Sequence, residues 1–203
     1  MNIIHRFLVI SVLCLCFLGF NTGVYVNSQS TDTTQISITV SSLCQASLIA
    51  YPEKRIPSTG NWSNLNEIEI YNSVNQKVGS LTLTSDNLGK MPVDLCQDVQ
   101  LSPGSYTFYI KGFSHLRRKI QNIQIQALNS VVPIDILLTT PDKLLLAGET
   151  SPVFDNKINS LDISTQIKAM YSTTSVKNDL NRDGKVNTLD ISNTIYNFYK
   201  LGE

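Results

Sequence analysis

The chain ends in two copies of one short pattern, and this repeat constrains the fold more than any other feature. Residues 155–164 read DNKINSLDIS, and residues 183–192, 28 positions further on, read DGKVNTLDIS. So short a repeat indicates two copies of one small unit that pack on each other and share a core. Apolar residues follow each block at helical spacing. They are Ile163, Ile167, Met170 and Tyr171 in the first copy and Ile191, Ile195, Phe198 and Tyr199 in the second.

The second copy contains the ligand spacing of a calcium loop. Between Asp179 and Asp190, oxygen-bearing side chains occupy loop positions 1, 3, 5, 9 and 12, and Gly184 occupies position 6. Ca²⁺ takes six to eight oxygen ligands, and a glycine at position 6 permits the sharp turn that brings them together. We therefore expect a calcium ion here. Its predicted ligands are Asp179, Asn181, Asp183, the backbone carbonyl of Lys185, Asn187 and Asp190.

The first copy departs from this spacing when it is counted back from Asp162 at position 12. Position 3 is then Val153, which has no side-chain oxygen, and Asn156 at position 6 tolerates a left-handed turn. Glu149 takes position 1 instead if the loop is enlarged. We expect this loop to bind calcium weakly or not at all. Its candidate ligands are Ser151 at position 1, Asp155 at position 5, the carbonyl of Lys157, Asn159 and Asp162.

Two loop–helix units without an entering helix resemble a type I dockerin. The duplicated Asn-Ser/Thr-Leu-Asp-Ile-Ser blocks and the ligand run ending in Asp190, rather than a glutamate, carry the resemblance. It implies a module that docks onto a cohesin-like partner in a calcium-dependent manner. The near identity of the copies implies a pseudo-twofold docking, with either repeat forward. In that family, loop positions 10 and 11 help to select the partner; here they are Ser160, Leu161, Thr188 and Leu189.

The first residues have the pattern of an export signal. Arg6 precedes an apolar run over residues 7–20 that is too short to span a bilayer comfortably. Cleavage after Ser28 is the prediction, and an uncleaved membrane anchor is the alternative. We expect a protein that is secreted or held at the cell surface. The predicted parts are a signal peptide (1–28), a β-sandwich (29–142) and a small all-α dockerin-like domain (143–203, repeats about 149–172 and 177–200).

Short strands separated by turn residues predict an all-β antiparallel sandwich of about seven strands. The expected strands are residues 35–41, 47–51, 67–71, 78–84, 92–96, 105–113, 119–126 and 131–138. Residues 101–112 combine a Pro-Gly turn with a Tyr-x-Phe-x-Ile strand. This segment is similar to the carboxypeptidase regulatory-like and transthyretin-like sandwiches of secreted bacterial proteins. That resemblance implies a structural or adhesive role.

Cysteine use agrees with export. Cys44 and Cys96 are the cysteines that remain after the predicted signal peptide. An even pair in an exported protein favours a disulfide. Two buried free thiols are the alternative.

The sequence offers little that would support catalysis. The formal net charge is zero, which gives no reason to expect nucleic acid as a partner. His115 is the one histidine after the predicted signal, and we expect it to be a solvated turn residue. Glu67 and Glu69 alternate with isoleucines, so both are predicted on the wet face of one strand. We therefore expect a protein that is not an enzyme.

Two alternatives to docking remain open at this stage. Trp62 and Tyr71 could stack on sugar rings, which would suit an accessory carbohydrate-binding subunit of a polysaccharide-degrading complex. Alternatively, the calcium-bound tail packs on its own sandwich and has no partner. A docking tail would stay mobile relative to the sandwich, whereas a tail of the second kind would not.

Overall fold

The structure, a computed structural model, describes residues 44–55, 62–125, 134–137 and 144–203. The predicted signal peptide and the predicted strand at residues 35–41 lie outside these ranges. The other seven predicted strands are all present, with ends shifted by at most three residues, as sequence patterns usually allow.

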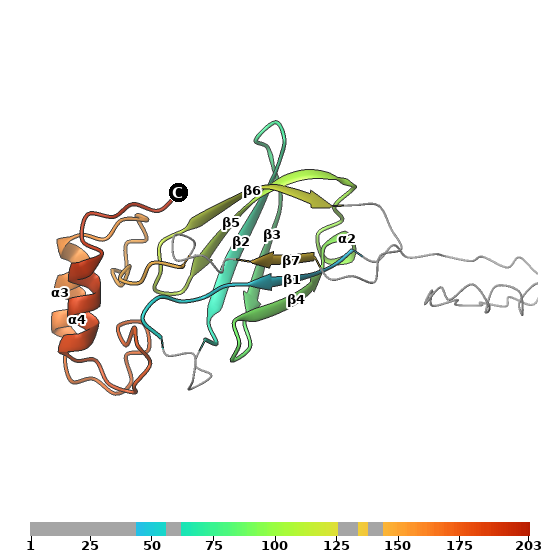
Figure 1. Cartoon of the computed structure of the whole chain (residues 1–203). Coiled ribbons are helices and arrows are strands. Elements are labelled where there is room, and N and C mark those ends of the chain that lie inside the picture. The colour runs from blue at the N-terminus through green and yellow to red at the C-terminus, as the bar shows by residue number, and fades with distance from the viewer. Residues whose placement is uncertain (1–43, 56–61, 126–133, 138–143) are drawn as a thin grey trace, which may run out of the picture.

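The strands form two sheets that face each other (Figure 1). The smaller sheet has the order β4 (Lys90–Asp94), β1 (Gln45–Ile49), β7 (Ile134–Leu137). The larger sheet has the order β3 (Lys77–Thr84), β2 (Leu65–Asn72), β5 (Gly104–Gly112), β6 (Arg118–Ile125). The predicted β-sandwich of mostly antiparallel strands is confirmed. The prediction of a wholly antiparallel sandwich is wrong, because β7 runs parallel to β1. The chain enters β7 by crossing from the larger sheet, so no hairpin forces the antiparallel direction.

Alternation along β2 explains how its sequence forms one wall of the core. Ile68 and Ile70 are fully buried, whereas Glu67 is exposed and Glu69 is half-buried. The prediction that both glutamates share the outward face is confirmed. Glu69 is paired there with Lys77 and Arg117.

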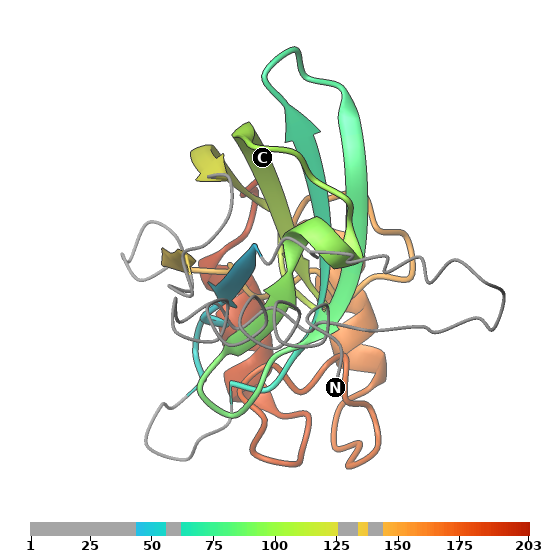
Figure 2. The same cartoon turned by 90° about the vertical axis from the view of Figure 1, so that its right-hand side faces the viewer.

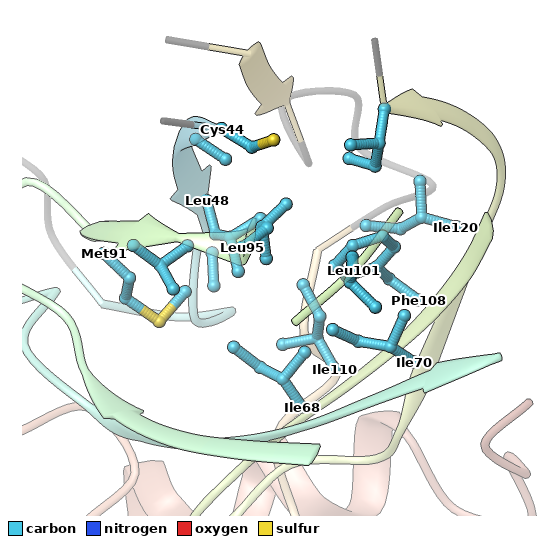
Figure 3. Close-up of a cluster of buried hydrophobic side chains, with 14 of the residues drawn as sticks. Cys44, Leu48, Ile68, Ile70, Met91, Leu95, Leu101, Phe108, Ile110 and Ile120 are labelled. Carbon is cyan, nitrogen blue, oxygen red and sulfur yellow. The ribbon is translucent and has the colours of Figure 1, made fainter. Parts of the chain in front are cut away.

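Apolar side chains from both sheets fill the space between them (Figure 3). Leu48 and Met91 come from the smaller sheet, and Phe108 and Ile110 from the larger one; all four are at most 1% exposed. Full burial of each such side chain stabilises the fold by about 1.5–3 kcal/mol. Leu145 belongs to the same cluster, so the chain still packs in the sandwich just beyond the boundary predicted at residues 142 and 143.

The strand predicted at residues 92–96 ends early, at Asp94. The Asp94 side chain caps the one-turn helix α2 (Leu95–Asp98) by accepting hydrogen bonds from the N–H groups of Cys96 and Gln97. Because the chain turns here, Cys96 lies beside the start of β1. The structure joins it to Cys44 in a disulfide, with the two Cα atoms 5.2 Å apart.

Two helices, α3 (Ser160–Lys168) and α4 (Thr188–Tyr196), lie at one end of the sandwich. Figure 2, which looks along the molecule from the other end, shows them behind the strands. Each begins with a capping box: Asn159 with Asp162 in α3, and Asn187 with Asp190 in α4. Within the described ranges, no helix has the length and apolar character needed to cross a membrane.

Candidate functional site

The two loop–helix units are related by matched backbone hydrogen bonds. Each loop pairs with the chain just after the other unit's helix, at residues 28 positions apart. The bonds run from Tyr171 N–H to the Val186 carbonyl (2.8 Å) and from Val186 N–H to the Ser172 carbonyl (2.9 Å). Their counterparts run from Tyr199 N–H to the Ile158 carbonyl (2.9 Å) and from Ile158 N–H to the Lys200 carbonyl (3.0 Å). Ile158 and Val186 are fully buried, so the two units share a core, as the repeat predicts.

The second loop is closed by its first and last carboxylates. Asp190 is fully buried, and its Oδ1 accepts from the N–H groups of Leu180 (2.8 Å) and Asn181 (3.3 Å). Asp179 Oδ2 accepts from Gly184 N–H at 2.9 Å. Gly184 has φ of +89°, a left-handed conformation that glycine adopts without strain. The turn thus brings position 1 and position 12 of the loop together.

The remaining predicted ligands form one cluster inside this loop. The Nδ2 atoms of Asn181 and Asn187 donate to Asp183 Oδ2 at 3.0 and 2.9 Å, and Asn187 Nδ2 also donates to the Lys185 carbonyl at 3.2 Å. The amide oxygens accept backbone hydrogen bonds: Asn181 Oδ1 from Asp183 N–H at 3.0 Å, and Asn187 Oδ1 from Leu189 N–H at 2.7 Å. The described residues hold no group of three or more His, Cys, Asp or Glu side chains arranged for a metal. The loop instead combines aspartates with amide and carbonyl oxygens, a donor set that fits calcium.

Electrostatics within the second loop also favour a cation. Burial raises the pKa of Asp190, and the nearby charge of Asp179 raises it further, against the lowering effect of three backbone N–H donors. Burial also opposes ionisation of Asp183, but hydrogen bonds from Asn181 and Asn187 leave the Asp183 pKa below its usual value. A bound cation would offset the repulsion between Asp179 and Asp190.

The first loop has the same hydrogen bonds in a different register. Glu149 Oε1 accepts from Asn156 N–H at 2.8 Å, as Asp179 does from Gly184, and Asn156 has φ of +58°. Ser151 N–H donates to Asp162 Oδ1 at 2.8 Å, as Asn181 does to Asp190. Ser151 therefore corresponds to loop position 3, and its assignment to position 1 is wrong. Glu149 takes position 1, as the alternative of an enlarged loop predicted, because two more residues lie between Ser151 and Asp155 than between Asn181 and Asp183.

The rest of the first loop follows the second closely. Asn159 Nδ2 donates to Asp155 Oδ2 at 3.1 Å, and Asn159 N–H donates to Asp162 Oδ2 at 2.9 Å. Lys157 is exposed, and its N–H donates to Asp155 Oδ1. One difference stands out: Lys111 Nζ lies 2.8 Å from Glu149 Oε2, so an ammonium group from β5 lies at the first ligand of this loop.

The two helices and the turns that follow them carry matched, exposed apolar side chains. The four predicted partner-binding residues, Ser160, Leu161, Thr188 and Leu189, are all exposed. So are three pairs 28 positions apart: Leu161 and Leu189 (53% and 58%), Ile167 and Ile195 (55% each), and Tyr171 and Tyr199 (70% and 81%). We call these six residues the outer face. Helical spacing alone did not show that Ile167 and Tyr171 point outward; the buried polar residues Gln166 and Thr194 occupy the inner side instead.

Buried polar contacts attach the helices to the sandwich on their inner side. Asn197, fully buried after α4, donates from Nδ2 to Glu53 Oε2 and to the Ala147 carbonyl (2.9 Å). Arg55 Nε donates to the Leu180 carbonyl at 3.3 Å. These contacts hold the helices in one position relative to the sandwich.

Replacing Asn197 with alanine should weaken this attachment. Asn197→Ala leaves Glu53 with one fewer donor in a buried setting, and we expect the free energy of unfolding to fall by about 2 kcal/mol. Denaturant unfolding would measure the loss. Asn193→Ala, at a half-buried position on the same helix, is the control and should change stability by less than about 0.5 kcal/mol. Equal losses in the two variants would contradict the attachment.

Other residues singled out from the sequence have structural surroundings. His115 is fully buried, so the prediction of a solvated turn histidine is wrong. Burial lowers the His115 pKa well below its usual value, and Arg55 and Arg182 lower it further. Its backbone forms an antiparallel bridge to Ala147, so the turn that contains His115 lies against the segment that leads into the first loop. Trp62 packs against Tyr51 and Tyr71 against Tyr109, so each aromatic has its own ring partner.

Comparison with known proteins gives a structural likeness. No family model and no curated protein sequence matches the chain. A chain of a type II cohesin–X-dockerin complex from Acetivibrio cellulolyticus, a C-terminal interface mutant, matches with a TM-score of 0.53 and 20% identity over 78% of this chain and 97% of that chain. An N-terminal interface mutant of such a complex from the same organism has 22% identity, the same coverage and a TM-score of 0.46. The first likeness shows a shared fold.

Proposed function

We propose that this is a secreted, non-catalytic protein that docks onto a cohesin-type partner through the outer face of α3 and α4. The main support is the outer face itself. It consists of three apolar pairs whose members are 28 positions apart, and each of the six side chains is more than half exposed. An isolated exposed leucine needs no explanation, but six large apolar side chains exposed at matched positions of one small module favour an interaction site. Its two similar halves suit a partner that can bind in either of two orientations.

Calcium in the second loop is the proposed ordering element of this module. Asp190 is both the last ligand and the residue that completes the capping box of α4. A cation held by Asp190 and Asp179 would fix where α4 begins. It would therefore fix the position of Leu189, next to Asp190, on the outer face. Calcium removal should weaken docking for this reason.

The structural likeness supports a protein-interaction role of the cohesin–dockerin kind. The matching share, 78% of the chain, is larger than the region from Cys44 to Ala147 that forms the sandwich and its edge. The likeness therefore involves more than the two sheets. The matched protein is named as part of a type II cohesin–X-dockerin complex. In this proposal, the sandwich of the present chain is the rigid support of the outer face.

The attachment through Asn197 and Glu53 favours a second candidate, in which the tail only packs on its own sandwich. An attached tail is also what the sequence led us to expect of this candidate, whereas a docking tail was expected to stay mobile. The inner contacts do not cover the outer face, however, so an attached tail can still dock. What separates them is whether the outer face binds anything. The docking proposal predicts a partner, and the second candidate predicts none.

Charges placed in the outer face should weaken docking strongly without unfolding the protein. We expect Leu161→Asp/Leu189→Asp to lose at least about tenfold in affinity, because a carboxylate would be desolvated in the interface. The assay is a pull-down from the secreted and surface fraction of the source organism, with calcium or chelator, followed by mass spectrometry. The wild-type chain should retain a protein with a cohesin-type module when calcium is present, and should not retain it in chelator.

Val74→Asp is the matched control, since Val74 is 77% exposed on the turn between β2 and β3, away from the helices. It should retain the partner as the wild type does. Retention of no such protein in any condition, or equal retention by the double variant, would leave the tail with a purely intramolecular role.

A further inference from the structure

Lys111 reaches from β5 into the first loop at the place of the first ligand. Its Nζ lies 2.8 Å from Glu149 Oε2, and the Glu149 side chain has no solvent exposure. The other oxygen, Oε1, accepts from Asn156 N–H, which makes Glu149 the counterpart of Asp179. Oε2 accepts no hydrogen bond from the described residues, and the Lys111 ammonium group is its ion-pair partner. An ammonium group therefore neutralises the carboxylate that would bind a metal.

A second ammonium group lies in the same loop. Lys177 Nζ donates to the Ser151 carbonyl and lies 3.8 Å from the centre of the Phe154 ring, while Lys111 Nζ lies 5.0 Å from it. Phe154 belongs to the enlarged part of the loop that the second loop lacks. Its ring face favours cations.

The first loop therefore differs from a calcium loop in its own residues. Its three carboxylates, Glu149, Asp155 and Asp162, share the loop with two lysine side chains. A divalent cation at Glu149 would have to displace Lys111 and leave its ammonium group in a mostly buried position, which is costly. The extension with Phe154 also widens the loop on the side of Ser151.

We propose that the ammonium groups of Lys111 and Lys177 take the place of calcium in the first loop, so that the protein takes up calcium in the second loop alone. The first loop is then ordered without metal and is joined to β5 by Lys111. This inference rests on the proposed function only in assuming that the second loop binds calcium.

Hydrogen exchange at two matched amides tests the proposal in the full-length mature chain. Gly184 N–H and Asn156 N–H occupy the same position in the two loops, each donating to the first carboxylate. Chelation should accelerate Gly184 exchange by at least about tenfold and leave Asn156 unchanged. Native mass spectrometry should count one calcium ion per chain.

Lys111→Met removes the ammonium group and keeps most of the side-chain volume. In chelator, we expect Asn156 exchange to accelerate by at least about tenfold in this variant. Lys157→Met, at an exposed lysine of the same loop, is the control and should behave as the wild type. Lys111→Arg, which keeps a cation, should also retain Asn156 protection if the methionine variant fails to fold.

The outcomes separate this proposal from the docking proposal. Calcium-dependent exchange at Asn156 in the wild type, two calcium ions per chain, or an unchanged Asn156 in folded Lys111→Met would overturn it. If Gly184 does not respond to calcium while Asn156 behaves as expected, calcium ordering of the second loop fails and the lysine-held first loop stands.

Discussion

Asp190→Ala is expected to lower calcium affinity by at least about 100-fold and to reduce the free energy of unfolding, without calcium, by about 3–5 kcal/mol. The affinity falls because the last ligand of the second loop is removed. The stability falls because Leu180, Asn181 and Asn187 each lose a hydrogen-bond acceptor for a backbone N–H group. Calcium titration by calorimetry and denaturant unfolding would measure the two effects.

Asp162→Ala is the matched control, because Asp162 accepts the corresponding three bonds in the first loop, from Thr150, Ser151 and Asn159. It should cost similar stability and leave calcium affinity unchanged. Each titration would be made under conditions where circular dichroism shows the variant to be folded. Unchanged calcium affinity in folded Asp190→Ala would refute the ligand assignment in the second loop.

Removal of the disulfide is expected to lower the free energy of unfolding by about 4 kcal/mol. Cys44 and Cys96 are 52 residues apart, so the bridge closes a long loop and restricts the unfolded chain strongly. The bridge also joins the start of β1 to α2, next to the core residue Leu95. Denaturant unfolding of Cys44→Ser/Cys96→Ser against the oxidised wild type would measure the effect.

Asp94→Ala distinguishes the contribution of the disulfide to stability from that of the hydrogen bonds around it. Asp94 caps α2 and accepts from Cys44 N–H at 3.2 Å, so its removal disturbs the same corner and leaves the bridge intact. We expect a loss of about 1 kcal/mol. If reductant does not change the unfolding midpoint of the wild type, the two cysteines are free thiols in solution.

The sequence predicted the local elements well, because their signals are local. Alternation around Ile68 and Ile70 predicted β2 and its wet face. The spacing of apolar residues after each repeat predicted both helices, and the structure adds that the Asn-Ser/Thr-Leu-Asp blocks cap them with residues within four positions of each other. The strand predicted up to Cys96 failed because a single side chain, that of Asp94, caps a helical turn there.

Contacts between residues far apart in the chain were harder to predict from the sequence. The parallel β7 and the buried His115 both depend on which distant segment packs beside them, and the periodicity of one strand carries no such information. The register of the first loop failed similarly: counting back from Asp162 assumed a fixed loop length, while the hydrogen bond from Asn156 to Glu149 revealed two extra residues.

By itself, the sequence determined the repeat, the six candidate oxygen ligands of the second loop and the leucine beside Asp190, because each is a matter of residue type and spacing along a few turns of chain. Only the tertiary structure decided that Lys111, some 40 residues before the first loop, neutralises Glu149, and that Asn197 attaches the helices to Glu53. A buried charge needs a partner, but nothing in the chain's local pattern says which distant residue will supply it.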